Sequence, residues 1–114
     1  MHELSLMDNL LNAAKEQLAP YSVKKVTAVR VKAGVLANIL PEAFQFAFET
    51  LSQGTYFAGA ELQYEEVPFQ AECLQCGTVF YAKNVQSVCP QCGCENYTIL
   101  SGFDVFLTGI DFEE

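Results

Sequence analysis

Two short cysteine motifs constrain this chain more than any other feature of its sequence. Each has the pattern C-x-x-C-G, the first from Cys73 to Gly77 and the second from Cys89 to Gly93. A C-x-x-C turn lets two thiolates reach one ion, and the glycine that follows can take the positive φ that such a tight turn needs. Two turns supply four sulfurs, the donor set that tetrahedral zinc prefers. The predicted zinc ligands are Cys73, Cys76, Cys89 and Cys92.

The rest of this segment indicates that the zinc is structural. Residues 71–98 are too few to build a core of their own, and segments of this size usually depend on a metal or on disulfides. A catalytic zinc keeps an open position, whereas all four predicted ligands here are sulfur. Cys94 is a spare thiol that competes for the fourth position, and we favour Cys92 because it completes the second C-x-x-C-G pattern. The residues expected to pack around the site are Phe80, Tyr81 and Val85.

The charge of the chain argues against nucleic-acid and membrane partners. It has 14 acidic residues against 6 Lys and Arg, a formal charge of −8, which repels phosphate backbones and anionic lipid. Lys83 is the single basic residue between residues 71 and 98, so this segment lacks the basic patch of a nucleic-acid-binding domain. There is no apolar run of about 18 residues, and Met1-His2-Glu3 lacks the basic start of a signal peptide. We expect a cytoplasmic protein, monomeric or homodimeric, with thiols rather than disulfides.

Hydrophobic periodicity predicts two helices. Residues 4–18 repeat apolar residues every three or four positions, and the helix ends before Pro20. A second helix starts at Pro41, because the N–H that proline lacks is unpaired in a first turn anyway, and it stops at Gly54. Its buried face is expected to consist of Ala43, Phe44, Ala47, Phe48 and Leu51.

Alternating apolar and polar residues predict three strands, over residues 24–33, 60–67 and 103–112. The phase of the last strand slips at Gly109, which suggests a β-bulge. In the first strand one face is expected to hold Thr27, Val29, Val31 and Ala33, and the other Ala28, Arg30 and Lys32. The basic residues Lys24, Lys25, Arg30 and Lys32 are either an ordinary solvated face or a docking site for an acidic partner.

The order helix, strand, helix, strand, insertion, strand predicts an α+β fold. Its three-stranded sheet is antiparallel or mixed and carries two helices on one face, and a zinc-ribbon-like domain is inserted before the last strand. The predicted domains are residues 1–68 with 99–114, and residues 69–98.

The N-terminus offers a second set of metal donors. His2 is the one histidine of the chain. The Met1 amine, a deprotonated backbone amide and the His2 imidazole can form fused chelate rings, and such nitrogen-rich, square-planar donors suit Ni(II) or Cu(II). Chemistry alone does not separate this site from an inert terminal histidine.

Met1-His2-Glu3 at the start of an amphipathic helix resembles the start of the HypA/HybF proteins, the nickel metallochaperones of hydrogenase maturation. The stretch from Pro41 to Glu49, the two cysteine turns and Ser101-Gly102 also match, so the resemblance covers essentially the whole chain in order. Two positions depart from the family. Cys94 stands where the family often has serine, and the loop 36–40 lacks a carboxylate that some relatives carry there.

The resemblance implies a nickel carrier rather than an enzyme. It carries nickel binding over to Met1, His2 and Glu3, through the Met1 amine, the His2 imidazole and the backbone at Glu3. It carries zinc binding over to the four cysteines. The partners it implies are the HypB GTPase and the large-subunit precursor of a nickel-iron hydrogenase.

Two other functions compete with this one. The first is a zinc-ribbon module for protein–protein interaction that has no nickel role. The second is a thiol oxidoreductase that uses a C-x-x-C pair. Reactive pairs of that class sit in electropositive surroundings, whereas the two pairs here share one predicted ion in an acidic chain. The interaction module is therefore the stronger alternative.

Overall fold

The computed structural model describes residues 3–114. They divide into two compact units. The first comprises residues 3–32, 39–65 and 106–114, and the second comprises residues 33–38 and 66–105. None of the described helices combines the length and apolar character that crossing a membrane requires.

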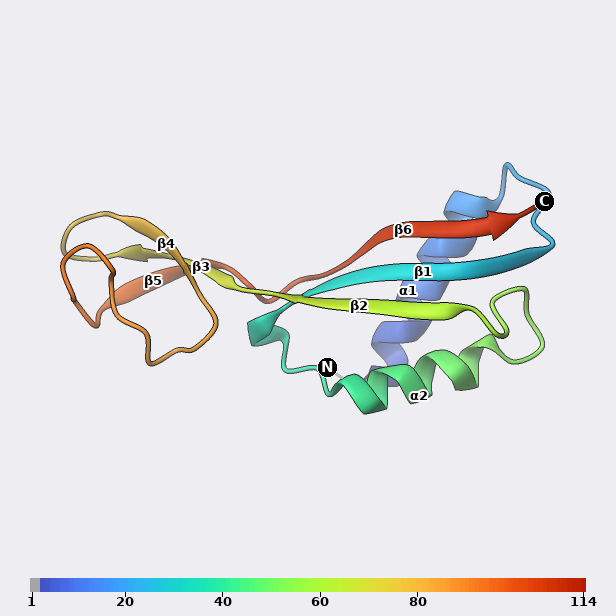
Figure 1. Cartoon of the computed structure of the whole chain (residues 1–114), viewed down its shortest axis with the longest axis horizontal. Coiled ribbons are helices and arrows are strands. Elements are labelled where there is room, and N and C mark those ends of the chain that lie inside the picture. The colour runs from blue at the N-terminus through green and yellow to red at the C-terminus, as the bar shows by residue number, and fades with distance from the viewer. Residues whose placement is uncertain (1–2) are drawn as a thin grey trace. The chain divides into compact units, whose positions relative to one another are not determined.

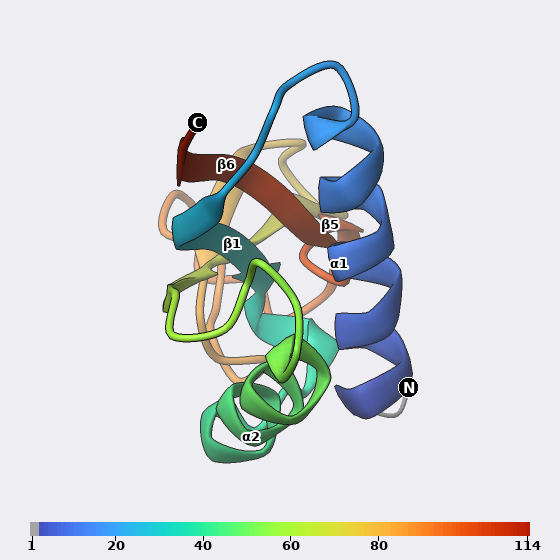
Figure 2. The same ribbon diagram turned by 90° about the vertical axis from the view of Figure 1, so that its right-hand side faces the viewer.

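Two helices form one layer of the first unit, as the periodicity predicts. α1 spans Glu3–Leu18 and α2 spans Pro41–Ser52. The helices contact each other, and Figures 1 and 2 show both on the same side of the strands. In α2, Phe44, Ala47 and Phe48 are buried as expected. The buried stripe then continues to Ser52 rather than to Leu51, because residues four apart lie above one another on a helix.

The other layer is a three-stranded sheet with the order β2-β1-β6. Its strands are β1 (Lys25–Gly34), β2 (Glu61–Val67) and β6 (Val105–Glu113). The Lys24 N–H donates to the Glu113 carbonyl, which joins the start of β1 to the end of β6 and makes this pair antiparallel. β1 and β2 run in the same direction (Figure 1), as a crossover through α2 requires. The sheet is therefore mixed, one of the two predicted arrangements.

The burial pattern of the strands confirms most of the predicted faces and corrects one. Val29, Val31 and Ala33 are buried, and Lys32 is exposed. Ala28 was predicted on the outer face but is only 6% exposed, because the alternation of β1 reverses its phase between residues 28 and 29. Alanine is too small and neutral to mark such a change in the sequence. In β6 the phase changes after Gly109, where the sequence predicts it.

The outer face of the sheet pairs its basic residues with acidic neighbours. The Arg30 guanidinium donates two hydrogen bonds to the Asp111 carboxylate, at 2.7 and 2.8 Å. Gly109 leaves the room for this, since a Cβ there would lie 2.9 Å from Arg30 Nε. Lys32 Nζ lies 3.6 Å from the Glu65 carboxylate. These contacts account for two residues of the basic stripe without an outside partner and favour the solvated-face interpretation.

The second unit contains a small antiparallel sheet of its own, with the order β4-β3-β5. Its strands are β3 (Phe69–Cys73), β4 (Val79–Ala82) and β5 (Tyr97–Ser101), none of which the sequence analysis identifies. Gln70 pairs with Ser101 and Ala71 with Ile99, so Leu100 is an extra residue on β5. The core behind this sheet consists of Phe69, Ala71, Cys73, Phe80 and Cys89.

A close approach of two backbone segments fixes one end of the second unit. Gly34 is the last residue of β1, and a short 3-10 helix (Val35–Ala37) follows it. The Gly34 N–H donates to the Asp104 carbonyl and the Leu36 N–H donates to the Gly102 carbonyl. Gly102 has φ +131°, a value that side chains rarely allow. The two glycines let the segments 33–38 and 101–105 lie in contact.

The sequence predicts two domains, residues 1–68 with 99–114 and residues 69–98. This division states which parts of the chain fold independently. That stays a prediction. The compact units differ from it because residues 33–38, 66–68 and 99–105 pack with the cysteine segment.

Gly34→Ala is expected to destabilise the second unit. A Cβ at residue 34 would lie 2.0 Å from the carbonyl oxygen of Gly102, which is backbone and cannot turn aside. Overpacking of this kind should lower the unfolding free energy by about 3 kcal/mol, measured by urea denaturation. Gly59→Ala is the control, because its φ of +79° is strained but its surroundings are open, so it should cost about 1–2 kcal/mol. A smaller loss for Gly34→Ala than for Gly59→Ala would contradict the steric explanation.

Arg30→Gln is expected to raise the pKa of Asp111. The hydrogen bonds and the charge of Arg30 hold the pKa of this carboxyl below its ordinary value in the folded chain. The pair therefore stabilises the fold above the ordinary aspartate pKa, and this contribution disappears as the pH falls through the lowered pKa. An NMR titration of the Asp111 carboxyl carbon measures the change, with Lys32→Gln as the control. Coincident curves for wild type and Arg30→Gln would contradict the assignment.

Candidate metal centre

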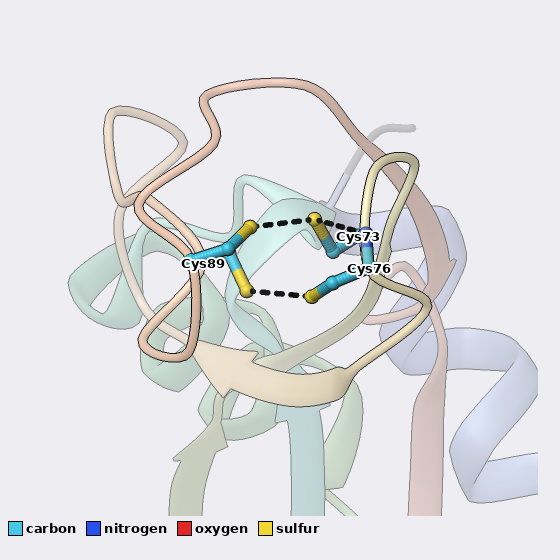
Figure 3. Close-up of side chains that lie close together, drawn as sticks. Cys73, Cys76 and Cys89 are labelled. Atoms are coloured by element: carbon cyan, nitrogen blue, oxygen red, sulfur yellow. Dashed lines mark hydrogen bonds between the residues drawn. The ribbon is translucent and has the colours of Figure 1, made fainter.

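Two loops of the second unit bring four cysteines together. Cys73 ends β3 and Cys76 lies in the turn that follows it. Cys89 and Cys92 lie in the connection between β4 and β5. Figure 3 shows Cys73 and Cys76 on one loop with their sulfurs facing those of the loop that carries Cys89. Each loop thus contributes two of the four sulfurs.

The two loops have the same backbone hydrogen bonds. The Gly77 N–H donates to the Cys73 carbonyl at 3.0 Å, and the Gly93 N–H donates to the Cys89 carbonyl at 2.8 Å. Both glycines have left-handed backbone conformations, with φ of +76° and +77°, as the C-x-x-C-G pattern predicts. The two turns are therefore near copies that present their thiols to the same point.

The sulfur positions fit a tetrahedral thiolate metal. Cys73 Sγ lies 3.5 Å from Cys92 Sγ, and Cys76 Sγ lies 3.6 Å from Cys89 Sγ. All four sulfurs lie within 4.8 Å of one another. Zinc–sulfur bonds of ~2.3 Å at tetrahedral corners place sulfurs about 3.8 Å apart. The cluster is thus able to hold a structural metal such as zinc.

The thiols of this cluster cannot all ionise together without a cation. The Cys76 N–H lowers the pKa of Cys73 to about 6, with help from the Gln75 N–H. Hydrogen bonding to Thr78 lowers the pKa of Cys76. The Cys94 N–H also acts to lower the pKa of Cys92, but partial desolvation of the sulfur and hydrogen bonding with the three facing cysteines outweigh it and raise that pKa to about 12. Cys73 and Cys76 therefore favour the thiolate form, whereas Cys92 favours the protonated form. A divalent cation bound among the sulfurs would offset the repulsion between thiolates and favour ionisation of all of them.

The cluster is closed on one side and open on the other. The first cysteine of each turn, Cys73 or Cys89, is 2% exposed, whereas Cys76 and Cys92 are exposed. Phe80 supports the buried side, as predicted. Tyr81 and Val85 were also expected there but are 68% and 59% exposed. Tyr81 points away because alternate residues of β4 face opposite sides, and Val85 lies beyond the end of the strand.

Tyr97, rather than the predicted Tyr81, packs against the small core on the buried side of the cluster. Its ring packs against both Phe69 and Phe80, with centroid separations of 5.9 and 5.7 Å. Its hydroxyl donates to the Val85 carbonyl at 2.5 Å and so ties down the long loop between the two turns. An aromatic residue just after the second C-x-x-C-G turn is the signal that could have identified it.

Cys94 lies outside the group of four sulfurs. Its carbonyl accepts a hydrogen bond from the Cys89 N–H, as the Thr78 carbonyl does from the Cys73 N–H. Its sulfur accepts one from the Asn96 N–H at 3.4 Å, and its side chain packs on the small core. Residue 94 therefore corresponds to residue 78 of the first turn, and Cys92 completes the cluster.

The other predicted metal site falls only partly within the structure. Met1 and His2 lie outside the described residues. Glu3 is the first residue of α1, and a helix leaves its first four N–H groups without partners inside it. The Glu3 side chain accepts a hydrogen bond from the Leu40 N–H at 3.5 Å. This contact joins the start of α1 to the start of α2 and has no signal in the sequence.

The chain is similar over nearly its whole length to one family of known proteins. The family model described as "Hydrogenase/urease nickel incorporation, metallochaperone, hypA" matches residues 1–112. The hydrogenase maturation factor HypA of Desulfitobacterium hafniense (strain DSM 10664 / DCB-2) is 39% identical over 114 residues, with 100% of both chains covered. That of Roseiflexus sp. (strain RS-1) is 37% identical over 115 residues, covering 100% of this chain and 94% of the relative.

Solved structures share the fold. The solution structure of a HypA protein has a TM-score of 0.70 at 26% identity and covers 99% of this chain and 97% of its own. The solution structure of the Ni metallochaperone HypA from Helicobacter pylori has a TM-score of 0.68 at 24% identity, with 98% and 97% covered. Since the family model and the relatives match nearly the full length, the chain belongs to the HypA family of nickel-incorporation metallochaperones of hydrogenase maturation.

Proposed function

We propose that this chain binds Ni(II) at its N-terminus and delivers it to the precursor of a nickel-iron hydrogenase. The observation that carries the proposal is the match of residues 1–112 to a family described by nickel incorporation. On this proposal nickel is cargo, and the chain is a carrier rather than an enzyme.

The proposed nickel donors are the Met1 amine, the His2 imidazole and the backbone nitrogen of Glu3. The helix supports the last of these. Because Glu3 begins α1, its N–H is one of the four that lack a partner inside the helix. Deprotonating and coordinating this nitrogen would break no hydrogen bond of α1. Nitrogen donors at the free end of a chain form a shallow site, which can pass the metal to a deeper one by ligand exchange.

The proposed zinc ligands are Cys73, Cys76, Cys89 and Cys92, and the proposed role of zinc is structural. Two of these sulfurs are part of the small core of the second unit, with Phe69, Ala71 and Phe80. So small a core gains most of its stability from the metal.

The proposed partners are the HypB GTPase and the hydrogenase large-subunit precursor, in the cytoplasm. The charge of −8 suits transfer partners that are themselves proteins and opposes binding to nucleic acid or anionic membrane. A zinc-ribbon interaction module without nickel is the alternative that the experiments below would reveal.

Cys89→Ser is expected to release zinc and unfold the cysteine segment. A structural zinc contributes about 10–16 kcal/mol of apparent binding free energy in small peptides, so the loss should be large. Metal analysis gives the zinc content, and amide hydrogen exchange shows which residues lose protection. The strands β1, β2 and β6 should keep theirs within the first unit.

Cys94→Ser is the matched control, because its sulfur lies outside the group of four. It should retain one zinc per chain. Zinc retained by Cys92→Ser and lost from Cys94→Ser would show that the fourth ligand is wrongly assigned.

His2→Ala is expected to abolish nickel binding while zinc content and fold are unchanged. Adding one residue before Met1 should do the same, because it converts the amine into an amide and lengthens the chelate. Isothermal titration of tag-free protein measures both effects. A micromolar site would correspond to roughly 8 kcal/mol, tight enough to carry nickel and weak enough to release it.

Acid should weaken nickel binding in the wild-type chain. Protons compete for the imidazole near pH ~6.5 and for the amine near pH ~7.7–8.0, so the affinity should fall from about pH 8 to pH 6. Full nickel affinity in either N-terminal variant would reject the proposed N-terminal site, whereas no nickel binding in the wild-type chain would leave the interaction module.

A further inference from the structure

A hollow of about 270 Å³ lies beside the C-terminal end of α2, within the first unit. From α2 it is lined by Phe48, Glu49 and Ser52, and from the segment that leads to β2 by Ala58 and Ala60. None of its lining residues, all of which the structure describes, is basic. The hollow belongs to neither of the metal sites, and the proposed function does not use it.

One of the lining residues has a buried hydroxyl without a partner. Ser52 is 3% exposed, and its Oγ has no hydrogen-bond partner among the described residues. The Ser52 carbonyl, in contrast, accepts hydrogen bonds from the Thr55 N–H at 3.1 Å and from the Thr55 hydroxyl at 2.7 Å. In the unfolded chain water would bind this hydroxyl, so burying it alone is unfavourable. A polar group that enters the hollow would supply the missing partner.

The charge around the hollow favours a cation. The last carbonyl groups of a helix carry a partial negative charge. α1 has Lys15 in its last turn, whereas α2 has no basic residue there. The Glu49 carboxylate adds a full negative charge, and a hydrogen bond of 3.2 Å from Gln45 Nε2 orients it. No lysine or arginine within residues 3–114 forms an ion pair with Glu49, so the cation must come from outside the described chain.

We propose that this hollow binds the side chain of a lysine presented by a partner protein. An ammonium group has three donors, enough to reach the Ser52 hydroxyl and the Glu49 carboxylate together. The aliphatic stem of the lysine would lie against the apolar lining of Phe48, Ala58 and Ala60. A divalent metal ion fits poorly, because it needs more oxygen ligands than this half-apolar lining offers.

The choice of lysine over arginine follows from the shape of the charged group. The ammonium group is compact and its donors rotate, whereas the guanidinium is a planar fork that suits two acceptors side by side. The acceptors here are one carboxylate and one hydroxyl that is almost closed off from solvent. The site uses neither nickel nor zinc, so the inference goes beyond the proposed function and does not depend on it.

The experiment titrates the isotope-labelled full chain with Nα-acetyl-lysine N-methylamide and follows the backbone amides by NMR. The shifts should concentrate on residues 49–53 and 58–60, with a dissociation constant on the order of 1 mM. The norleucine derivative has a similar aliphatic stem without the ammonium group, and it should leave these amides unshifted. Sodium chloride at equal ionic strength should do the same.

Two substitutions separate the contributions of the hydroxyl and the carboxylate. Ser52→Ala should weaken lysine binding about tenfold, through the loss of one hydrogen bond to a charged group. It should be at least as stable as the wild type, because it removes an unpaired buried hydroxyl and alanine favours the helix. Glu49→Gln should weaken binding about two- to fivefold, since this carboxylate is exposed. Glu42→Gln is the matched control, an exposed acidic residue of α2 outside the hollow, and should bind as the wild type does.

The contrary outcomes are distinct. Shifts spread over the acidic surface, equal shifts with the norleucine derivative, or wild-type affinity in Ser52→Ala would each overturn the proposal. A marked loss of stability in Ser52→Ala would show that the hydroxyl has a partner within the chain, and would overturn it as well. Binding of butylammonium without the lysine derivative would assign the hollow to free amines and reject a partner's lysine. Lysine binding in a wild-type chain that does not bind nickel would reject the proposed function and leave this inference standing.

Discussion

The convergence of four sulfurs is the interaction on which the second unit depends. Its sheet has strands of only four or five residues, and the core behind it is small. Two members of that core, Cys73 and Cys89, also belong to the sulfur cluster. Metal binding would therefore be coupled to hydrophobic packing, because the side chains that complete the core are the ones that would hold the ion.

The shared backbone geometry of the two turns explains why the four sulfurs face one point. Each turn uses a glycine at positive φ and a return hydrogen bond to its first cysteine. The backbone N–H groups of residues 75 and 76 point at Cys73 Sγ and stabilise its thiolate. Electrostatics then favours a cation at the centre, since neighbouring thiolates repel one another and the pKa of Cys92 is raised. The same geometry leaves Cys94 aside as a packing residue.

The first unit is held together by packing and by ion pairs. Its helices meet near the N-terminus through the contact between Glu3 and Leu40, while the sheet satisfies its own charges by pairing Arg30 with Asp111 and Lys32 with Glu65. Membership of the HypA family associates the chain with nickel incorporation in hydrogenase maturation. The sulfur cluster of the second unit suits a structural metal such as zinc.

The sequence by itself determined the features that arise from local chemistry. Cysteine spacing with glycine identified the four sulfurs, and periodicity located both helices and the three strands of the larger sheet, because these signals lie within a few residues of one another. Tertiary structure alone decided the rest. The reversed phase at Ala28, the pairing of β3 with β4 and β5, the packing of Tyr97, and the hydrogen bond from Leu40 to Glu3 each depend on partners distant in sequence. The sequence around a backbone N–H or a small side chain does not indicate which distant residue will contact it. Only the folded chain, which brings the two partners together, reveals the contact.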